Sequence, residues 1–338
     1  MVKNSLSGMD NVKHKHHYVP RRYLRAWSKN GDDVIYVRIG SGCPMPMNIN
    51  GVGFGQGYYS YEKLNFEILR SVLCCKPRSR LVTDNMMREL FFHTIVIQIF
   101  CQLLIDPLDK ELVKMWRLVE DSNLIDSDRA IKLEHFCSRF KGDKIQLIEF
   151  CQRYTREGYE NIISNIESKA WPILDSMKEG DLRWLKDDES AINMFYYIFT
   201  QRMRSPAFDK VSKDFYGFRV SNDFIKGGSY RRHILALDSA GLMMELRDKF
   251  SFRILSLPSE EEFITGDLPV ICINQQDEGD YYFPLSPKAA FLFGPCMDFE
   301  KRNEGLLKLS HGSAMYLNNE IATNAVRQVY ASDIKFLV

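Results

Sequence analysis

The stretch Glu189-Ser-Ala-Ile-Asn-Met-Phe-Tyr-Tyr-Ile-Phe-Thr-Gln-Arg-Met203 is the part of the chain that best predicts its fold. Its large apolar side chains recur every three or four residues, which is typical of a helix with one buried side; they are Ile192, Phe195, Tyr196, Phe199 and Met203. Tyr197, Gln201 and Arg204 follow one another at i, i+4 and i+7, so they share a different face of the same helix. Ser205-Pro206 is expected to end the helix, because proline disfavours helical geometry in the residue before it.

Helical patterning extends from this stretch back to about Glu62. The further segments that we expect to be helical are Leu90–Ile105, Leu108–Asp121, Lys144–Arg156 and Tyr159–Met177. Leu90–Ile105 is the most apolar, but it is shorter than the roughly 20 residues that a bilayer requires, and polar residues recur along one of its faces, so it predicts a buried helix and no membrane span. Pro172 is expected to kink the last segment or to begin a second helix there.

Strand-like segments flank the helical middle on both sides. Val34–Ile39 predicts a strand near the start of the chain, whereas the alternating glycines from Gly51 to Gly57 predict a flexible loop. Beyond Lys249 we expect strands at Phe252–Leu257, Val270–Asn274 and Ala289–Phe293, and a last helix that is capped by Asn318-Asn319 and runs through Tyr330. The predicted class is α+β, with a largely helical middle, a small N-terminal strand module and a C-terminal antiparallel or mixed β portion.

Composition bounds the organisation of the molecule. The 338 residues with 45% hydrophobic and 26% charged content fit one domain over 1–338, which can be subdivided into 1–61, 62–248 and 249–338. Because 45 basic residues balance 44 acidic ones, any basic binding surface must be local. The polar first residues lack a signal peptide, and the eight cysteines contain no CxxC pair, so we expect a cytoplasmic protein with reduced thiols. The oligomeric state stays open.

A cluster of histidine, arginine and aromatic residues lies between His14 and Trp27. Histidine transfers protons or binds metals near neutral pH, and arginine pairs with phosphates and carboxylates, so the cluster predicts a site for an anionic ligand. His16 and His17 are the candidate catalytic residues, and Arg21 and Tyr23 are candidates for substrate binding. In an extended segment, adjacent histidines point to opposite faces, so one can serve the site while the other forms a structural hydrogen bond. A polar segment with a basic surface is the alternative interpretation.

Further candidates come from the rest of the chain. Gln201 and Arg204 offer an amide and a guanidinium on one helical face, which suits recognition of a phosphate or a base edge; the alternative is a role at the helix end. Asp267 is a candidate catalytic carboxylate between two apolar segments, although its neighbours are also ordinary turn residues. Glu167 is a second such carboxylate, with pairing to Lys169 or a neighbouring arginine as the alternative.

Four motifs stand in an order that resembles the family of domain of unknown function 4238. They are His16-His-Tyr-Val-Pro20 with Tyr23-Leu24, Gln201-Arg-Met-Arg-Ser-Pro206, Thr265-Gly-Asp-Leu-Pro-Val270 and Pro284-Leu-Ser-Pro287. The resemblance runs over most of the chain and implies a mostly bacterial, intracellular protein without a settled activity. Ser205 departs from the Arg-Thr-Pro pattern of the family, and Gly266 and Leu268 stand where Ser and Asn are common. Positions that match its landmarks are His16, His17, Gln201, Arg204 and Asp267.

Two functions follow as hypotheses. The first is a nucleic-acid-directed hydrolase, an RNase or DNase used in phage defence or as a toxin, with a histidine as base or metal ligand. In it, Asp267 and Glu167 hold a divalent ion such as magnesium or manganese or orient the histidine, Arg204 stabilises the phosphorane, and Gln201 positions RNA or DNA. The second is a non-catalytic module that binds a nucleotide, a nucleic acid or a protein through its arginines and aromatic residues.

Overall fold

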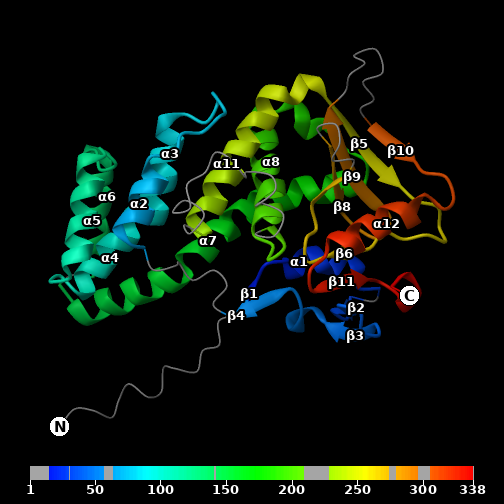
Figure 1. The fold of residues 1–338 in the computed structure, drawn as a ribbon, viewed down its shortest axis with the longest axis horizontal. Coiled ribbons are helices and arrows are strands. Elements are labelled where there is room, and N and C mark those ends of the chain that lie inside the picture. Colours follow the sequence, from blue (N-terminus) through cyan, green and yellow to red (C-terminus); the bar gives the residue numbers. More distant parts are fainter. Residues whose placement is uncertain are drawn as a thin grey trace, which may run out of the picture.

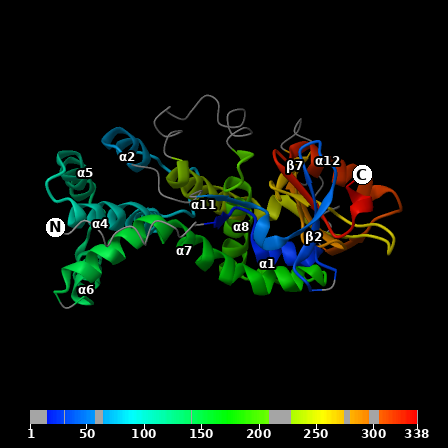
Figure 2. The same ribbon diagram turned by 90° about the horizontal axis from the view of Figure 1, so that it is seen from below.

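The computed structural model describes residues 15–29, 31–56, 64–140, 142–208, 228–273, 279–295 and 305–337. Most helices lie toward one end of the molecule and the strands lie at the other, and α7 (Lys144–Lys178) runs from the helical end toward the β end (Figure 1). The view from below shows the same separation of the helical end from the β end (Figure 2). The predicted α+β class is therefore confirmed.

Short helices build the outer part of the helical end, and four of the five begin at a side-chain cap. They are α2 (Phe66–Leu73), α3 (Asp84–Phe91), α4 (Ile97–Ile105), α5 (Lys110–Asp121) and α6 (Ser127–Ser138). The side chains of Asn65, Thr83, Asp109 and Asp126 each accept a backbone N–H in the first turn of the helix that follows, which satisfies donors that no helical carbonyl reaches. Helix α4 ends at Ile105, directly before Asp106-Pro107, as predicted.

The predicted helix Leu90–Ile105 is part of a longer one. Helix α3, a π-helical segment (Phe92–Val96) and α4 form a continuous helix over Asp84–Ile105, and this correction arises because the amphipathic turns of α3 precede the apolar run. Its 22 residues are long and apolar enough to cross a membrane by length and composition, while half of its most apolar window is buried inside the molecule. The core helix of a soluble protein has the same properties, so this helix is weak evidence for a membrane span.

Three long helices connect the two ends. The two predicted segments Lys144–Arg156 and Tyr159–Met177 form a single helix, α7 (Lys144–Lys178), which carries Pro172 in its interior. Helix α8 (Asp188–Met203) begins at the capping side chain of Asp187 and confirms the predicted helix at Glu189–Met203. Helix α11 (Gly228–Leu246) packs against α8, and α7 packs against both α4 and α8.

The β end contains two larger sheets and a small two-stranded one. The five-stranded sheet has the order β10-β5-β9-β8-β7, and only its β10–β5 pair is parallel. These strands are β5 (Phe250–Ser256), β7 (Ile271–Ile273), β8 (Asp280–Pro284), β9 (Ala289–Pro295) and β10 (Gly305–Lys308). The strands predicted at Phe252–Leu257, Val270–Asn274 and Ala289–Phe293 are thus present with shifted ends, and Asn274 itself lies outside the described residues.

The N-terminal strands join the C-terminal ones. The four-stranded sheet has the order β3-β2-β11-β6 and is antiparallel throughout. Its strands are β2 (Val34–Ile39), β3 (Met45–Asn48), β6 (Thr265–Gly266) and β11 (Gln328–Ala331). The remaining strands, β1 (Lys15–His17) and β4 (Phe54–Gln56), pair with each other. The predicted N-terminal strand module therefore shares a sheet with the C-terminal strand β11.

Two predictions about local structure are wrong. The last helix, α12 (Ser313–Asn324), contains Asn318 and Asn319 in its interior, and Tyr330 belongs to β11. The amide of Asn318 instead accepts the backbone N–H of Ile264 at 2.9 Å and donates to the carbonyl of Glu262, which ties the helix to the preceding loop. The predicted glycine loop forms a 3₁₀ turn, Ile49–Gly51, and then β4, because β1 supplies strand pairing to a segment that has little strand propensity of its own. Gly57 lies outside the described residues.

Candidate functional site

Strand β1 places the two candidate histidines on opposite faces. His16 lies opposite Gly55 and His17 opposite Phe54 in the β1–β4 pair, and successive strand residues alternate in direction. His16 is buried, whereas His17 is half-buried with its ring 5.8 Å from that of Phe54. The alternation that the sequence predicted for these residues is therefore present.

His16 faces a carboxylate of α7. Its Nε2 atom lies 3.6 Å from Oε2 of Glu160, and the Glu160 side chain is 41% exposed. Glu160 was not among the residues predicted from the sequence, because nothing in the pattern of α7 indicates which of its carboxylates lies against β1. The sequence did contain one indication of its position. Glu160 precedes the candidate Glu167 by seven residues, which is about two helical turns, so the two carboxylates share one face of α7. The pair brings a buried imidazole next to a carboxylate that solvent reaches.

Glu167, Gln201 and Arg204 form a buried polar cluster between α7 and α8. Arg204 Nη1 donates to Glu167 Oε1 at 2.7 Å, and Arg204 Nη2 donates to Gln201 Oε1 at 2.5 Å. Gln201 and Arg204 are each 1% exposed, and the Glu167 side chain is 19% exposed. The face that we predicted for α8 is thus confirmed, and Glu167 pairs with an arginine as its alternative interpretation stated. The Arg204 guanidinium is therefore paired with the Glu167 carboxylate inside the protein.

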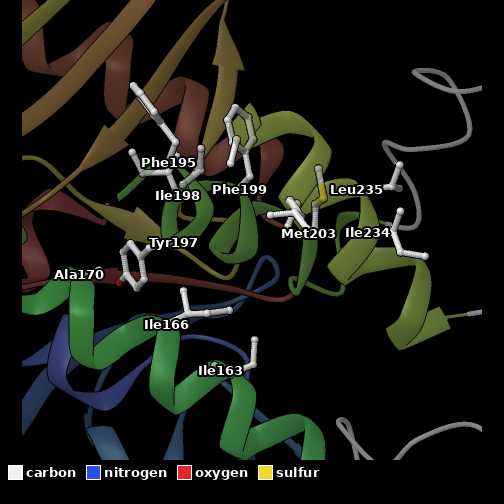
Figure 3. Close-up of a cluster of buried hydrophobic side chains, with 14 of the residues drawn as sticks. Ile163, Ile166, Ala170, Phe195, Tyr197, Ile198, Phe199, Met203, Ile234 and Leu235 are labelled. Carbon is white, nitrogen blue, oxygen red and sulfur yellow. The ribbon is translucent and has the colours of Figure 1, made fainter. Parts of the chain in front are cut away.

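Tyr197 adds an aromatic hydroxyl to this cluster. Its ring centre lies 5.5 Å from that of Trp171 on α7. Figure 3 shows the Tyr197 ring extending from α8 toward Ala170, which also belongs to α7. Burial raises the pKa of Tyr197 well above its ordinary value, and the nearby charge of Glu167 raises this pKa further. The hydroxyl therefore stays protonated at neutral pH.

Tyr23 enters the same interior region from α1 (Arg21–Leu24). Its hydroxyl donates to the backbone carbonyl of Pro284 at 2.7 Å and lies 2.8 Å from Thr265 Oγ1. Burial raises the pKa of Tyr23 strongly, while the hydrogen bond with Thr265 lowers it slightly. This hydroxyl joins α1 to β8 and β6, so the geometry supports a structural role beside the predicted role in substrate binding.

The arginines of α1 lie at the surface. Arg21 is exposed and donates from Nη1 to Asn50 Oδ1 at 2.8 Å. Arg22 lies 3.1 Å from Asp175, and its guanidinium is 5.1 Å from the centre of the Trp171 ring. Its side chain is 54% exposed, so it can still meet an anion from solvent.

Asp267 holds a backbone turn. Its carboxylate oxygens accept the N–H groups of Val326, Arg327 and Gln328, directly after α12. Its own carbonyl accepts the hydroxyl of Ser205 at 2.5 Å, which links this turn to the end of α8. Burial raises the pKa of Asp267, although the three backbone hydrogen bonds act in the opposite direction. The carboxylate that we predicted to be catalytic thus has a structural function in this geometry.

Five of the eight predicted site residues fall into two neighbouring groups, whereas the contacts of His17, Arg21 and Asp267 described above are with other parts of the protein. Tyr23, Glu167, Gln201 and Arg204 surround Tyr197, while His16 meets Glu160 two turns earlier on α7, which corresponds to about 10 Å along the helix. Within the residues that the structure describes, no group of three or more His, Cys, Asp or Glu side chains is placed to hold a metal ion. His16 and Glu160 bring together an imidazole and a carboxylate, which are groups that can transfer protons.

The fold and the site together define an α+β protein with a buried polar cluster where α1, α7 and α8 meet. The chain belongs to the family described as proteins of unknown function, DUF4238, whose model matches residues 15–335. Neither the curated proteins nor the solved structures contain a match to this chain.

Proposed function

We propose that this protein is a nucleic-acid-directed hydrolase that cleaves RNA, with the His16–Glu160 pair as its proton acceptor. The observation that carries the proposal is the 3.6 Å approach of the buried imidazole to a carboxylate that is 41% exposed. A carboxylate next to histidine is a recurrent arrangement for general acid–base catalysis, because each group tunes the proton affinity of the other. Arg21 and Arg22 begin α1, a short distance along the chain from β1, and supply positive charge at the surface.

The chemistry of this pair favours RNA over DNA. The 2′-hydroxyl of RNA is an internal nucleophile that needs only a base to remove its proton. In the proposed step Glu160 faces the substrate, and the proton of the 2′-hydroxyl passes to the Glu160–His16 pair. The 2′-oxygen then attacks phosphorus, and the bond to the 5′-oxygen breaks. That oxygen takes a proton from water, which leaves a 2′,3′-cyclic phosphate and a 5′-hydroxyl end.

The proposal is tested by incubating end-labelled RNA and DNA of one sequence with the purified protein, in magnesium, in manganese and in chelator. We expect cleavage of RNA in all three conditions, and a loss of 100-fold or more in Glu160→Gln and His16→Gln, as is typical when a general base is removed. Glu149→Gln is the matched control, since Glu149 is an exposed carboxylate on the same helix. Unchanged cleavage in Glu160→Gln would refute the assignment, and cleavage that requires a metal would restore the predicted ion.

A binding module is the second candidate. The observation that favours it is the exposed Arg22 guanidinium over Trp171, because arginine and aromatic residues together form stacking surfaces for nucleotides. Binding of RNA by wild-type protein without any cleavage, lost in Arg22→Ala and kept in Glu160→Gln, would select this candidate.

A further inference from the structure

Strand β10 forms an edge of the five-stranded sheet. Among the described strands it pairs only with β5, and it lies at the outside of the sheet (Figure 1). The side chains of Leu306 and Leu307 are 53% and 38% exposed, and they point to opposite faces of the strand. An exposed apolar edge strand is a template for pairing with another chain, because its outward N–H and C=O groups have no partner in the sheet.

The other edge strands of the two larger sheets are less suited to such pairing. Strand β3 contains Pro46, which has no N–H group to donate. Strand β6 has only two residues, and β7 has three, of which Ile271 and Ile273 are buried. Strand β10 combines four residues without proline and two exposed leucines. It is therefore the least protected edge of these sheets.

The bonds on the inner side of β10 decide which backbone groups point outward. The N–H of Leu309 donates to the carbonyl of Ser256 at the end of β5, at 2.9 Å. Because backbone groups alternate in direction along a strand, Leu307 also faces β5, and the N–H and C=O groups of Leu306 and Lys308 point outward. If two copies pair antiparallel around a twofold axis at Leu307, Leu306 of each copy lies opposite Lys308 of the other. This register satisfies all of these outward groups and brings the two Leu307 side chains together.

The charges beside β10 support the same register. A Cβ atom added to Gly180, just after α7, would lie 3.9 Å from Cβ of Leu306, so Leu306 is next to the end of that helix. Lys308 of the second copy, opposite Leu306, is therefore placed beside Glu179. Both Lys308 and Glu179 are exposed, and neither forms an ion pair with another residue that the structure describes. A register centred on Lys308 would instead put two lysines opposite each other, which is unfavourable.

We propose that this protein forms a symmetric homodimer in which the two β10 strands pair antiparallel around Leu307. The two five-stranded sheets then continue into each other, the exposed leucines are covered, and the ion pair between Lys308 and Glu179 of the other copy fixes the register. Because only a short edge is buried, we expect weak association, with a dissociation constant of about 10 µM. The dimer is independent of the proposed hydrolase activity.

Sedimentation velocity of the full chain over about 1 to 100 µM tests the dimer, because this range brackets the expected dissociation constant. Wild type should change from monomer to dimer across it. Leu307→Lys places two like charges opposite each other, so it should raise the dissociation constant at least about tenfold. Leu108→Lys is the matched control, since Leu108 is 86% exposed at the helical end; it should dimerise as wild type does.

Charge reversal tests the register. Lys308→Glu and Glu179→Lys should each weaken the dimer about threefold or more, because each places like charges side by side across the interface. The double variant Lys308→Glu/Glu179→Lys restores opposite charges and should recover dimerisation close to that of wild type. All of these positions are exposed, so the monomer is expected to fold in every variant.

Disulfide cross-linking measures the register directly. The two Leu307 residues form a pair without hydrogen bonds, whose Cα atoms are about 4.5 Å apart, whereas the two Leu306 residues are diagonal neighbours about 7–8 Å apart. Only the first distance suits a disulfide. Under oxidation by copper phenanthroline, Leu307→Cys should therefore give a covalent dimer linked at position 307, as located by peptide mass spectrometry. Leu306→Cys is the control and should stay at the wild-type background.

A protein that stays monomeric at every concentration would overturn the proposal, as would a dimer that Leu307→Lys leaves unchanged. A double charge variant that dimerises no better than its two single variants, or Leu306→Cys that cross-links as readily as Leu307→Cys, would overturn the register. Cleavage of RNA has no bearing on these results, so the dimer and the hydrolase stand or fall separately.

Discussion

At the scale of single residues, the ion pair between Glu167 and Arg204 is the largest electrostatic feature of the buried cluster. Arg204 is 1% exposed and Glu167 19% exposed, so both charges are largely removed from water. Removing one partner of such a pair leaves the other charge uncompensated, whereas removing both together is far less harmful. The pair therefore connects α7 to α8 and balances the charge of the Arg204 guanidinium inside the protein.

Glu167→Gln is expected to lower the free energy of unfolding by about 3 kcal/mol, because it leaves the Arg204 guanidinium without its carboxylate. Urea denaturation at neutral pH measures this loss. Lys169→Gln is the control, since Lys169 is exposed and was the other predicted partner of Glu167; it should change the free energy by less than about 0.5 kcal/mol. Equal effects of the two substitutions would contradict the pairing, and Glu167→Gln/Arg204→Met should recover part of the stability.

His233 makes stability depend on pH. It lies buried in α11, and burial lowers its pKa from 6.5 to about 3. Between these values the unfolded chain binds a proton at this position and the folded protein does not, so stability falls as the pH decreases below about 6.5. Relative to His233→Gln, wild type should lose about 1.4 kcal/mol per pH unit between pH 6 and 4, as measured by urea midpoints. Parallel curves for the two proteins would show that His233 does not titrate in this way.

At the scale of elements, contacts between distant segments decide where α12 and β4 form. Asn318 projects from the middle of α12 and bonds both Ile264 and Glu262, while Glu261 accepts the N–H groups of Gly312 and Ala314 at the start of the helix. The beginning of α12 is thus set by a carboxylate some fifty positions earlier in the chain. A pair of asparagines is a capping signal only when the backbone before it is not helical.

Asn318→Ala is expected to destabilise the protein by about 2 kcal/mol, because the backbone N–H of Ile264 loses its acceptor in a partly buried position. Asn319→Ala changes the adjacent, exposed asparagine of the same helix and should have an effect within about 0.5 kcal/mol. Thermal unfolding followed by circular dichroism compares the two. If both asparagines behave alike, the bridging role of Asn318 is wrong.

At the scale of the whole molecule, N-terminal segments of the chain pack and pair with C-terminal ones. Strand β2 pairs with β11, and the Trp27 indole donates to the carbonyl of Phe263 at 2.9 Å, as the Tyr23 hydroxyl does to that of Pro284. Because of these long-range contacts, we expect the N-terminal and C-terminal regions to unfold as one cooperative unit. They also bring α1 onto the α7–α8 interface, where the candidate site lies.

Tyr23→Phe is expected to lower the free energy of unfolding by about 2 kcal/mol, since a buried carbonyl and a threonine hydroxyl both lose their partner. The transition should stay single, with the same urea midpoint by near-UV and far-UV circular dichroism. Tyr36→Phe, in a partly buried position of β2, serves as the control and should leave the midpoint in place. Two separated transitions would show that the N-terminal module folds independently of the rest.

The sequence predicted the elements better than the site. Helical spacing identified α8 and the shared face of Tyr197, Gln201 and Arg204, because that periodicity depends only on nearby residues. The roles of Asp267 and Glu160 could not be predicted from this local periodicity. A carboxylate between two strands serves a backbone turn as readily as a substrate, and the partner of His16 depends on which face of α7 the β1–β4 pair covers.

Local patterning by itself determined the α+β class, the order of helical and strand regions, the ends of α4 and α8, and the residues that α8 presents together. Only the tertiary structure decided that β4 forms, that α12 begins at Ser313, that Glu167 pairs with Arg204 and that His16 meets Glu160. The physical reason is range: helix periodicity and proline breaks act over a few residues, whereas strand pairing and burial of charge depend on segments that meet only when the chain has folded.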